Sequence, residues 1–259
     1  MTILNISLPE LQIFFLIFLR VSAILMTVPL FSSKNIPLLF KIGLAISISV
    51  LLFPILSLNE ELITSEVIPY GIEIVSEILL GVIIGLSVRV IFAGIQLAGQ
   101  LAGFQMGFAI VNVMDPLTSA QSSIIAQLKN LIAMLLFLAT NAHHWFLRAL
   151  VDSFRLVPPF GFHLTNPLFE YLMRLGGNMF IIAIKVAAPV MIALLLTSVA
   201  LGLVARTVPQ MNVFIVAFPL KIVIGFLVLA FSLPYLFSFL KHVFNGLPND
   251  MLFILKAMI

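Results

Sequence analysis

The 259-residue sequence contains no cysteine and few charged residues. The absence of cysteine excludes disulfides, thiol nucleophiles and cysteine-ligated metal sites. Lysine, arginine, aspartate and glutamate make up only 9% of the chain, and the net charge of +3 comes from basic residues scattered singly along it. A nucleic-acid-binding surface needs clustered basic side chains, so we expect no binding to nucleic acid.

The sequence also lacks the short motifs of common catalytic sites: a GxxxxGK phosphate loop, a GxSxG elbow, an HExxH metal motif and a dinucleotide fingerprint. His143 and His144 are adjacent, so on a helix they point about 100° apart and do not form a chelating i, i+4 pair. We expect them to anchor the chain at a membrane interface beside Trp145 or to hydrogen-bond within the fold. We therefore expect no enzymatic activity, no cofactor and no metal site.

Hydrophobic residues, by contrast, make up 62% of the chain, and the mean hydropathy is +1.25. A soluble domain cannot bury so much apolar surface, so the composition indicates an integral membrane protein. A helix of about 20 residues crosses the hydrocarbon layer. The apolar runs predict an all-α membrane protein with about six hydrophobic segments, at residues 11–31, 36–58, 67–111, 124–150, 169–206 and 212–240.

Two of these runs, 67–111 and 169–206, are too long for one upright helix, so each is expected to be a bent hairpin or a long tilted helix. Proline inside a helix removes a backbone hydrogen bond and bends the chain. We expect kinked helical hairpins within a larger assembly, and a single domain over residues 1–259. Five prolines lie inside the apolar runs: Pro29, Pro54, Pro189, Pro219 and Pro234.

Charged residues also fall within or beside the apolar runs. At about 2.5 to 3.5 kcal/mol for each charge at a helix centre, seven such charges facing lipid would cost on the order of 20 kcal/mol. Lys41 and Lys221 lie where they can extend toward the membrane surface. The others need partners, water or another subunit. The seven are Arg20, Lys41, Glu73, Glu77, Arg89, Lys185 and Lys221.

Five of the residues between positions 73 and 89 recur at intervals of four, which places them on one stripe of a helix. Two acids lie at one end, two glycines in the middle and a base at the other end. Small residues at this spacing allow another backbone to approach closely, so we expect a partner helix to pack here. The alternative is that the two acids lie at a membrane surface and are solvated. The stripe is Glu73, Glu77, Gly81, Gly85 and Arg89.

The stretch 99–116, GQLAGFQMGFAIVNVMDP, carries glycines, amides and methionines where a stable lipid-facing helix would carry leucine. Loosened backbone at membrane depth must be buried in protein or line a passage. Methionine and phenylalanine adapt to irregular contacts, so they serve here as ordinary packing or as a deformable seal. Asp115 precedes Pro116, a pair that we interpret as a turn that ends the helix rather than as a proton carrier.

Several patches, taken in order along almost the whole chain, make the sequence similar to the FliR family of type III secretion export-gate subunits. Asn141, His143, Ser153 and Phe154 follow the central patch at the family's spacing. The opening patch, with Arg20, Pro37 and Lys41, is weakly specific by itself. The two more specific patches contain Gly99, Gln100, Gly103, Gln105, Met106, Gly107, Asp115 and Pro116, and then Arg206, Pro209, Gln210 and Asn212.

The resemblance implies a non-enzymatic subunit of the bacterial inner membrane, within the flagellar basal body. It implies assembly with FliP and FliQ around a channel for unfolded flagellar proteins, with FlhB and FlhA nearby and lipid around the complex. It also implies a pore-closing plug formed by Gly103, Gln105, Met106, Gly107, Phe108, Asn112, Met114, Asp115 and Pro116. Independently of the resemblance, the buried charges and small residues predict helix packing or partner contacts through Glu73, Glu77, Gly81, Gly85, Arg89 and Lys185.

Two alternatives remain open at this point. Virulence-type secretion systems contain related proteins, although the extent of the match favours the flagellar branch. A secondary transporter for a small solute also uses broken helices and buried charges, but its inverted repeats would leave similar interruptions in both halves of the chain. We find no such symmetry in this sequence.

Overall fold

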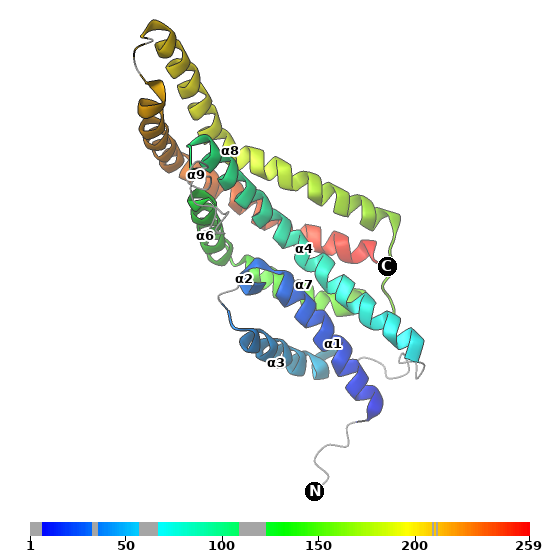
Figure 1. Cartoon of the computed structure of the whole chain (residues 1–259). Coiled ribbons are helices and arrows are strands. Elements are labelled where there is room, and N and C mark those ends of the chain that lie inside the picture. Colours follow the sequence, from blue (N-terminus) through cyan, green and yellow to red (C-terminus); the bar gives the residue numbers. More distant parts are fainter. Residues whose placement is uncertain (1–6, 33–35, 57–66, 109–122, 209, 211) are drawn as a thin grey trace. The chain divides into compact units, whose positions relative to one another are not determined.

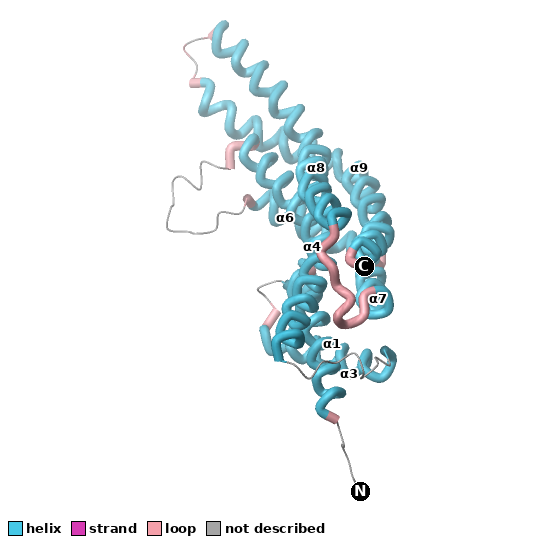
Figure 2. Tube along the Cα trace, turned by 90° about the vertical axis from the view of Figure 1, so that its right-hand side faces the viewer, coloured by secondary structure: helices cyan, strands magenta, loops and turns pink. Residues whose placement is uncertain are grey.

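A computed structural model describes residues 7–32, 36–56, 67–108, 123–208, 210 and 212–259 (Figure 1). Within these residues every regular element is a helix (Figure 2). Five of the helices are long and apolar enough to cross a membrane, and α6 and α7 together satisfy the same criteria as a broken span. The predicted all-α membrane fold is therefore confirmed. The helices are α1 (Leu8–Thr27), α2 (Pro29–Ser32), α3 (Leu38–Leu56), α4 (Val67–Gln105), α6 (Ile124–Ala139), α7 (Ala142–Leu156), α8 (Asn166–Thr207) and α9 (Val213–Ala257).

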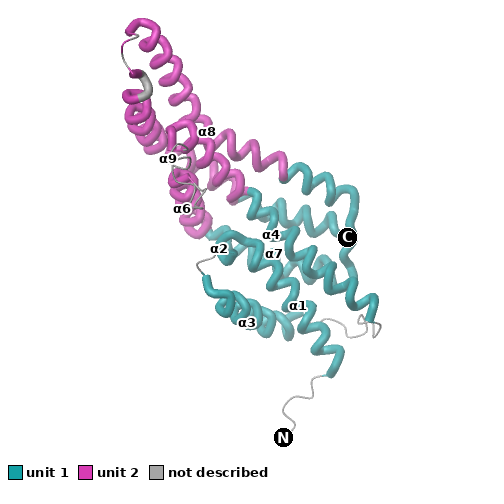
Figure 3. The backbone as a smooth tube through the Cα atoms, viewed as in Figure 1, with its two compact units in different colours: residues 1–90, 141–175, 245–259 teal, residues 91–140, 176–244 magenta. Residues whose placement is uncertain are grey.

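The chain divides into two compact units, and each unit is made of separate segments that alternate along the sequence (Figure 3). Unit 1 contains residues 1–90, 141–175 and 245–259, and unit 2 contains residues 91–140 and 176–244. Helices α4, α8 and α9 contribute residues to both units, whereas α6 lies in unit 2 and α7 in unit 1. The single domain expected from the sequence stays a prediction.

Helix α1 begins at a capping box. The Ser7 hydroxyl accepts the backbone N–H of Glu10 at 3.2 Å, and the Glu10 carboxylate accepts the backbone N–H of Ser7 at 2.7 Å. These two bonds satisfy donors that the first turn of a helix otherwise leaves unpaired. The helix ends at Thr27, one residue before Val28 adopts an extended conformation.

Within the run 67–111, residues Val67–Gln105 form one continuous helix, α4, rather than a hairpin. Its 39 residues correspond to a contour length of about 58 Å at about 1.5 Å per residue, nearly twice the hydrocarbon thickness of about 30 Å. In its most apolar window, 61% of the residues are buried inside the chain, which is the largest share among the candidate spans. This part of α4 therefore contacts mainly other residues of the chain.

The prolines inside the apolar runs occupy different positions in the helices. Pro29 begins α2 after the break that ends α1, whereas Pro54 lies within α3 and Pro189 within α8. Helix α9 continues through Pro219 and Pro234. Figure 1 shows that α8 changes direction along its yellow part. Proline loosens these helices without ending them, as expected where other groups can satisfy the displaced carbonyls.

Each unit has its own apolar core. In unit 1, Leu16 and Ile24 of α1 and Leu80 of α4 are completely buried. In unit 2, the rings of Phe92, Phe137 and Phe244 pack together with centroid separations of 5.4 to 6.1 Å. The most apolar windows of α3 and α9 are the least buried among the candidate spans, at 17% and 11%. Their remaining apolar faces are available to lipid or to other proteins.

Candidate functional site

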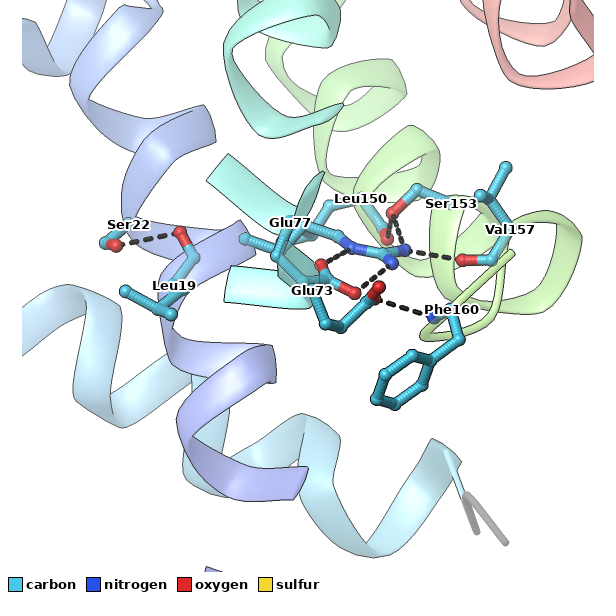
Figure 4. A network of polar contacts seen from close by, with 9 residues as sticks. Leu19, Ser22, Glu73, Glu77, Leu150, Ser153, Val157 and Phe160 are labelled. Carbon is cyan, nitrogen blue, oxygen red and sulfur yellow. Dashed lines mark hydrogen bonds and ion pairs between the residues drawn. The ribbon is translucent and has the colours of Figure 1, made fainter. Parts of the chain in front are cut away.

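In unit 1, Arg20 of α1 forms a buried ion pair with Glu77 of α4 (Figure 4). Nε of Arg20 donates to Oε2 of Glu77, and Nη2 donates to Oε1 at 2.6 Å. Both side chains are 1% exposed. This bidentate geometry matches the planar guanidinium to both oxygens of the carboxylate and is the strongest common form of such a pair.

The remaining donors of Arg20 reach the end of α7. Its Nη1 donates to the Ser153 hydroxyl at 3.3 Å and to the Val157 carbonyl at 2.9 Å. The ring of Phe154 covers the guanidinium at 4.1 Å from its centroid. The Arg20 side chain of α1 therefore contacts both α4 and the end of α7. Ser153 and Phe154 belong to the patch that the sequence resemblance singled out, although their positions in sequence gave no reason to expect Arg20 as their partner.

Glu73, one turn before Glu77, binds a different group. Its Oε1 accepts the backbone N–H of Phe160 at 2.6 Å, and the side chain is buried (Figure 4). Phe160 lies between α7 and α8 and has a positive φ of 66°, which is uncommon for an aromatic residue. The carboxylate therefore holds a connection whose backbone conformation is otherwise unfavourable. Both acids are buried within the chain, not solvated at its surface.

Two glycines bring α4 close enough to α1 for this ion pair to form. A Cβ at Gly81 would lie 2.7 Å from the Cβ of Ala23 and 2.9 Å from the carbonyl oxygen of Arg20, and a Cβ at Gly85 would overlap Thr27. The helix that packs along the predicted stripe is therefore α1 of the same chain. Small residues at these positions allow the two backbones to approach at this distance.

The other charges predicted near the apolar runs do not join this network. Arg89, the last member of the stripe, is exposed, and so is Lys185, whose Nζ lies 5.7 Å from the centroid of the Phe239 ring. Lys41 and Lys221 are half-buried. A role for Arg89 and Lys185 in contacts with partner proteins stays a prediction.

In unit 2, α4 ends at a well-formed C-terminal cap. Gly107 has a φ of +93°, its N–H donates to the Phe104 carbonyl at 3.1 Å, and the N–H of Phe108 donates to the Gly103 carbonyl at 3.1 Å. These two bonds form a Schellman motif, in which glycine takes the left-handed position. The helix ends here, before Asp115 and Pro116 are reached. The cap is a local signal, because glycine at this position accepts the positive φ at little cost.

The first candidate plug residues pack within unit 2. Met106 is completely buried, and a Cβ at Gly225 of α9 would lie 2.7 Å from its Cε. The rings of Phe108 and Phe226 meet edge to face, with centroids 6.4 Å apart. The sequence suggested a pore-closing role for Met106, but within this chain Met106 fills the core beneath Gly225. Its flexible thioether fits this irregular gap.

The same end of α4 packs closely against the start of α6. A Cβ at Gly99 would overlap the backbone of Ala126, and one at Gly103 would overlap the side chain of Ser123. The two ends of the described chain that flank residues 109–122 are therefore close together. Gln105 is half-buried and Gln100 is exposed. The remaining plug candidates, Asn112, Met114, Asp115 and Pro116, lie outside the described residues.

The last family patch lies where α8 ends and α9 begins. Arg206, Gln210 and Asn212 are exposed, and the Asn212 carbonyl accepts the N–H of Ile215 at 3.1 Å. Pro209 lies outside the described residues. At the opposite end of the chain, the carbonyl of Pro37 accepts N–H groups in the first turn of α3, from Phe40 and Lys41.

Lys129 is a buried charge that sequence reasoning missed. It is 3% exposed, and its Nζ donates to the backbone carbonyl of Val186 at 3.1 Å. A signal was present, because Lys129 falls on the buried face of α6 together with Ala126, Ala133 and Phe137. A lysine at apolar helical spacing indicates a buried amine that needs an acceptor.

His143 and His144 lie in the first turn of α7, which begins at Ala142 after Asn141 adopts a left-handed conformation with a φ of 55°. Their rings lie 4.2 Å apart at the centroids, and Nδ1 of His143 is buried without a hydrogen-bond partner. Within the part of the chain that the structure describes, no three metal-binding side chains gather at one place.

Comparison with known proteins identifies the family. The family model described as bacterial export proteins, family 1, matches residues 11–247. The chain is 39% identical over 239 residues to the flagellar biosynthetic protein FliR of Bacillus subtilis (strain 168), with 90% of each chain covered. It is 36% identical to FliR of Pectobacterium carotovorum subsp. carotovorum, with 90% of this chain and 88% of that one covered. It is 32% identical to FliR of Escherichia coli (strain K12), with 92% and 91% covered. The chain therefore belongs to the bacterial export proteins, family 1, and within that family to the FliR flagellar biosynthetic proteins.

Proposed function

We propose that this chain is a subunit of the flagellar type III export gate, where it forms a channel for unfolded flagellar proteins together with FliP and FliQ. Membership of an export family supports the transport role, and the names of the relatives support the flagellar branch over a virulence-type system. The complex lies in the bacterial inner membrane within the basal body, with FlhB and FlhA nearby.

The observation that carries this proposal is the apolar surface of α8 and α9 in unit 2. Exposed apolar side chains recur along α8 from Phe180, 56% exposed, through Ile192, 60%, to Leu203, 63%. The contour length between the first and last is about 35 Å, which exceeds the hydrocarbon thickness of about 30 Å. On α9 the pattern continues with Ile215, 70% exposed, and Phe231, 82%. An exposed apolar surface of this extent is covered by lipid or by neighbouring subunits, and contiguous apolar patches mark protein–protein or membrane contacts, which supports the proposed assembly.

The end of α4 supports the second part of the proposal, a closure formed by the residues that follow Phe108. Its Schellman cap and the contact of Gly103 with Ser123 hold both flanking helices in place. A segment with fixed ends can change position without disturbing the helices that carry it. Met106 and Phe108 then act as its anchor, and Asn112 and Met114 are the candidates for the closure itself.

Isolation in mild detergent tests the assembly. An affinity-tagged chain, expressed with its flagellar operon, is expected to co-purify with FliP and FliQ in one complex. Single cysteines in this cysteine-free chain at Ile192 and Leu203 are expected to lose maleimide reactivity when the partners are co-expressed. A cysteine at buried Leu194 serves as the unreactive reference. A chain that purifies alone and transports a small solute in liposomes would contradict the proposal.

Cysteine accessibility also tests the closure. Variants N112C and M114C are labelled with a membrane-impermeant maleimide in assembled complexes, with and without an export substrate trapped in the channel. We expect trapping to reduce labelling at both positions, but not at L39C, because Leu39 is 83% exposed on α3. Deleting residues 109–114, which spares Met106 and Phe108, is expected to raise ion conductance. Labelling and conductance that do not respond would exclude the plug.

A further inference from the structure

The buried amine of Lys129 has an acceptor whose position is informative. Val186, whose carbonyl receives the Nζ hydrogen bond at 3.1 Å, lies on α8 three residues before Pro189. Within the described residues Lys129 forms no ion pair, and the polar group that its Nζ contacts is the carbonyl of Val186. Desolvating an amine without an acceptor costs several kcal/mol, so this hydrogen bond is needed to keep Lys129 where it is.

Pro189 lies beside this carbonyl on α8. Its missing N–H leaves the carbonyl of Lys185, four residues earlier, without its usual partner, and its ring clashes with that carbonyl. Helices also kink where a side chain enters the i→i−4 ladder, and here the Lys129 amine binds the carbonyl of Val186, whose helical partner is the N–H of Val190. Groups freed in this way are satisfied by neighbouring side chains in membrane helices. Val186 lies in the turn before Pro189, and Figure 1 shows the change in direction of α8.

Helix α6, which carries Lys129, is itself held firmly within unit 2. Its first turn is clasped by Gly99 and Gly103 of α4. On the other side, Val190 and Leu194, which follow Pro189 on α8, are completely buried in the same core as Ile125 of α6. The amine therefore joins the disrupted turn of α8 to a helix that cannot easily follow if α8 straightens.

We propose that Lys129 is a clamp that stabilises the bend of α8 at Pro189. The bent form offers the carbonyl of Val186 to the amine, whereas in a straighter α8 this carbonyl would accept the N–H of Val190 and the buried amine would lose its acceptor. The clamp sets the direction of residues 190–207, including Arg206 at the end of α8. This inference does not depend on the proposed export role.

A distance measurement across the bend tests the clamp. Spin labels are attached to N178C and L203C, two exposed positions on either side of Pro189, in the full chain within its purified complex. A straight helix would separate these backbone positions by about 38 Å, and a bend shortens the distance. In Lys129→Met we expect the mean distance to move by several ångströms toward about 38 Å, because methionine has similar length but no donor.

Three further variants make the result specific. Lys241→Met removes an exposed lysine of α9 and is expected to leave the distance unchanged. Pro189→Ala restores the N–H and is expected to lengthen the distance, and adding Lys129→Met to it should then have little further effect. Lys129→Arg keeps a donor and provides the measurement if the methionine variant does not fold; it should retain the original distance. A Lys129→Met distance equal to that of Lys241→Met, or a Lys129→Arg distance equal to that of Pro189→Ala, would overturn the clamp.

Discussion

Arg20 of α1 lies against the ring of Phe154 of α7, with the guanidinium carbon 4.1 Å from the ring centroid, while the edge of the same guanidinium binds Glu77. The flat cation thus uses its face for the aromatic ring and its edge for hydrogen bonds. An ammonium group has neither a flat face nor a fork of donors, so the site is specific for arginine. This specificity leads to the first prediction.

Replacing Arg20 by methionine is expected to lower the stability of the purified complex by about 3–5 kcal/mol, because Glu77 would remain buried without its cation. Arg20→Lys should recover only part of this loss. The measurement is the melting temperature, monitored by fluorescence-detected size-exclusion chromatography. Arg148→Met is the matched control: its side chain is 70% exposed and lies 3.8 Å from Asp152. Such a pair contributes less than about 1 kcal/mol. Equal losses in the two variants would argue against the buried network.

Glu73 and Glu77 are expected to respond differently to conservative replacement. Glu77→Gln leaves the guanidinium without a counter-charge and should destabilise strongly. Glu73→Gln retains an oxygen for the N–H of Phe160 and should be tolerated, whereas Glu73→Ala should cost about 1–3 kcal/mol and expose the connection between α7 and α8 to chymotrypsin. The double alanine variant is expected to co-purify less FliP and FliQ. Equal protease sensitivity of Glu73→Gln and Glu73→Ala would refute the assigned hydrogen bond.

Gly81→Ala is expected to destabilise the chain by about 1–3 kcal/mol, because the added methyl group meets Ala23 and the backbone of α1. Gly71→Ala on the same helix is the control, since nothing lies within 4 Å of its Cβ position. That change should be neutral or stabilising by up to about 1 kcal/mol through helix propensity. Chemical denaturation of both variants measures the difference. A Gly81→Ala variant as stable as Gly71→Ala would show that α1 is not packed this closely.

Gly107→Ala is expected to weaken the end of α4 by about 1–2 kcal/mol, because a residue with a Cβ resists positive φ. The methyl group would also approach the Phe218 ring, with a Cβ distance of 2.8 Å to Cδ1. Gly202→Ala, within α8 and with open space around its Cβ position, is the control. Hydrogen exchange in the peptide that covers residues 99–108 should rise in the first variant alone. Unchanged exchange would mean that the cap does not hold this helix end.

Much of this architecture follows from local pattern. The apolar runs predict the helices because each segment must satisfy its own backbone in lipid. The stripe of Gly81 and Gly85 predicts close packing, since spacing on one helix is sufficient to reveal it. Neither pattern identifies the partner, and α1 of the same chain was as acceptable as a helix of another subunit.

Long-range polar partners are harder to predict. Arg20 and Val157 meet only because three helices converge, and no pattern near either residue reports this convergence. The end of α4 was predicted too late, at Asp115 and Pro116, because proline is the more familiar stop signal. Gly107 ends the helix through an equally physical signal, a left-handed cap that glycine accepts most readily. For Lys129, by contrast, a local signal was present but not used, because the helical spacing of its apolar neighbours indicates a buried amine.

The capping box at Ser7 has a consequence for Arg20. Because Ser7 and Glu10 determine where α1 begins, they also determine the angular position of every later side chain on that helix. Each residue turns an α-helix by about 100°, so inserting or deleting one residue between the cap and the arginine would rotate the guanidinium away from α4. Homologues should therefore tolerate many exchanges of one aliphatic side chain for another in this interval, yet show almost no variation in its length.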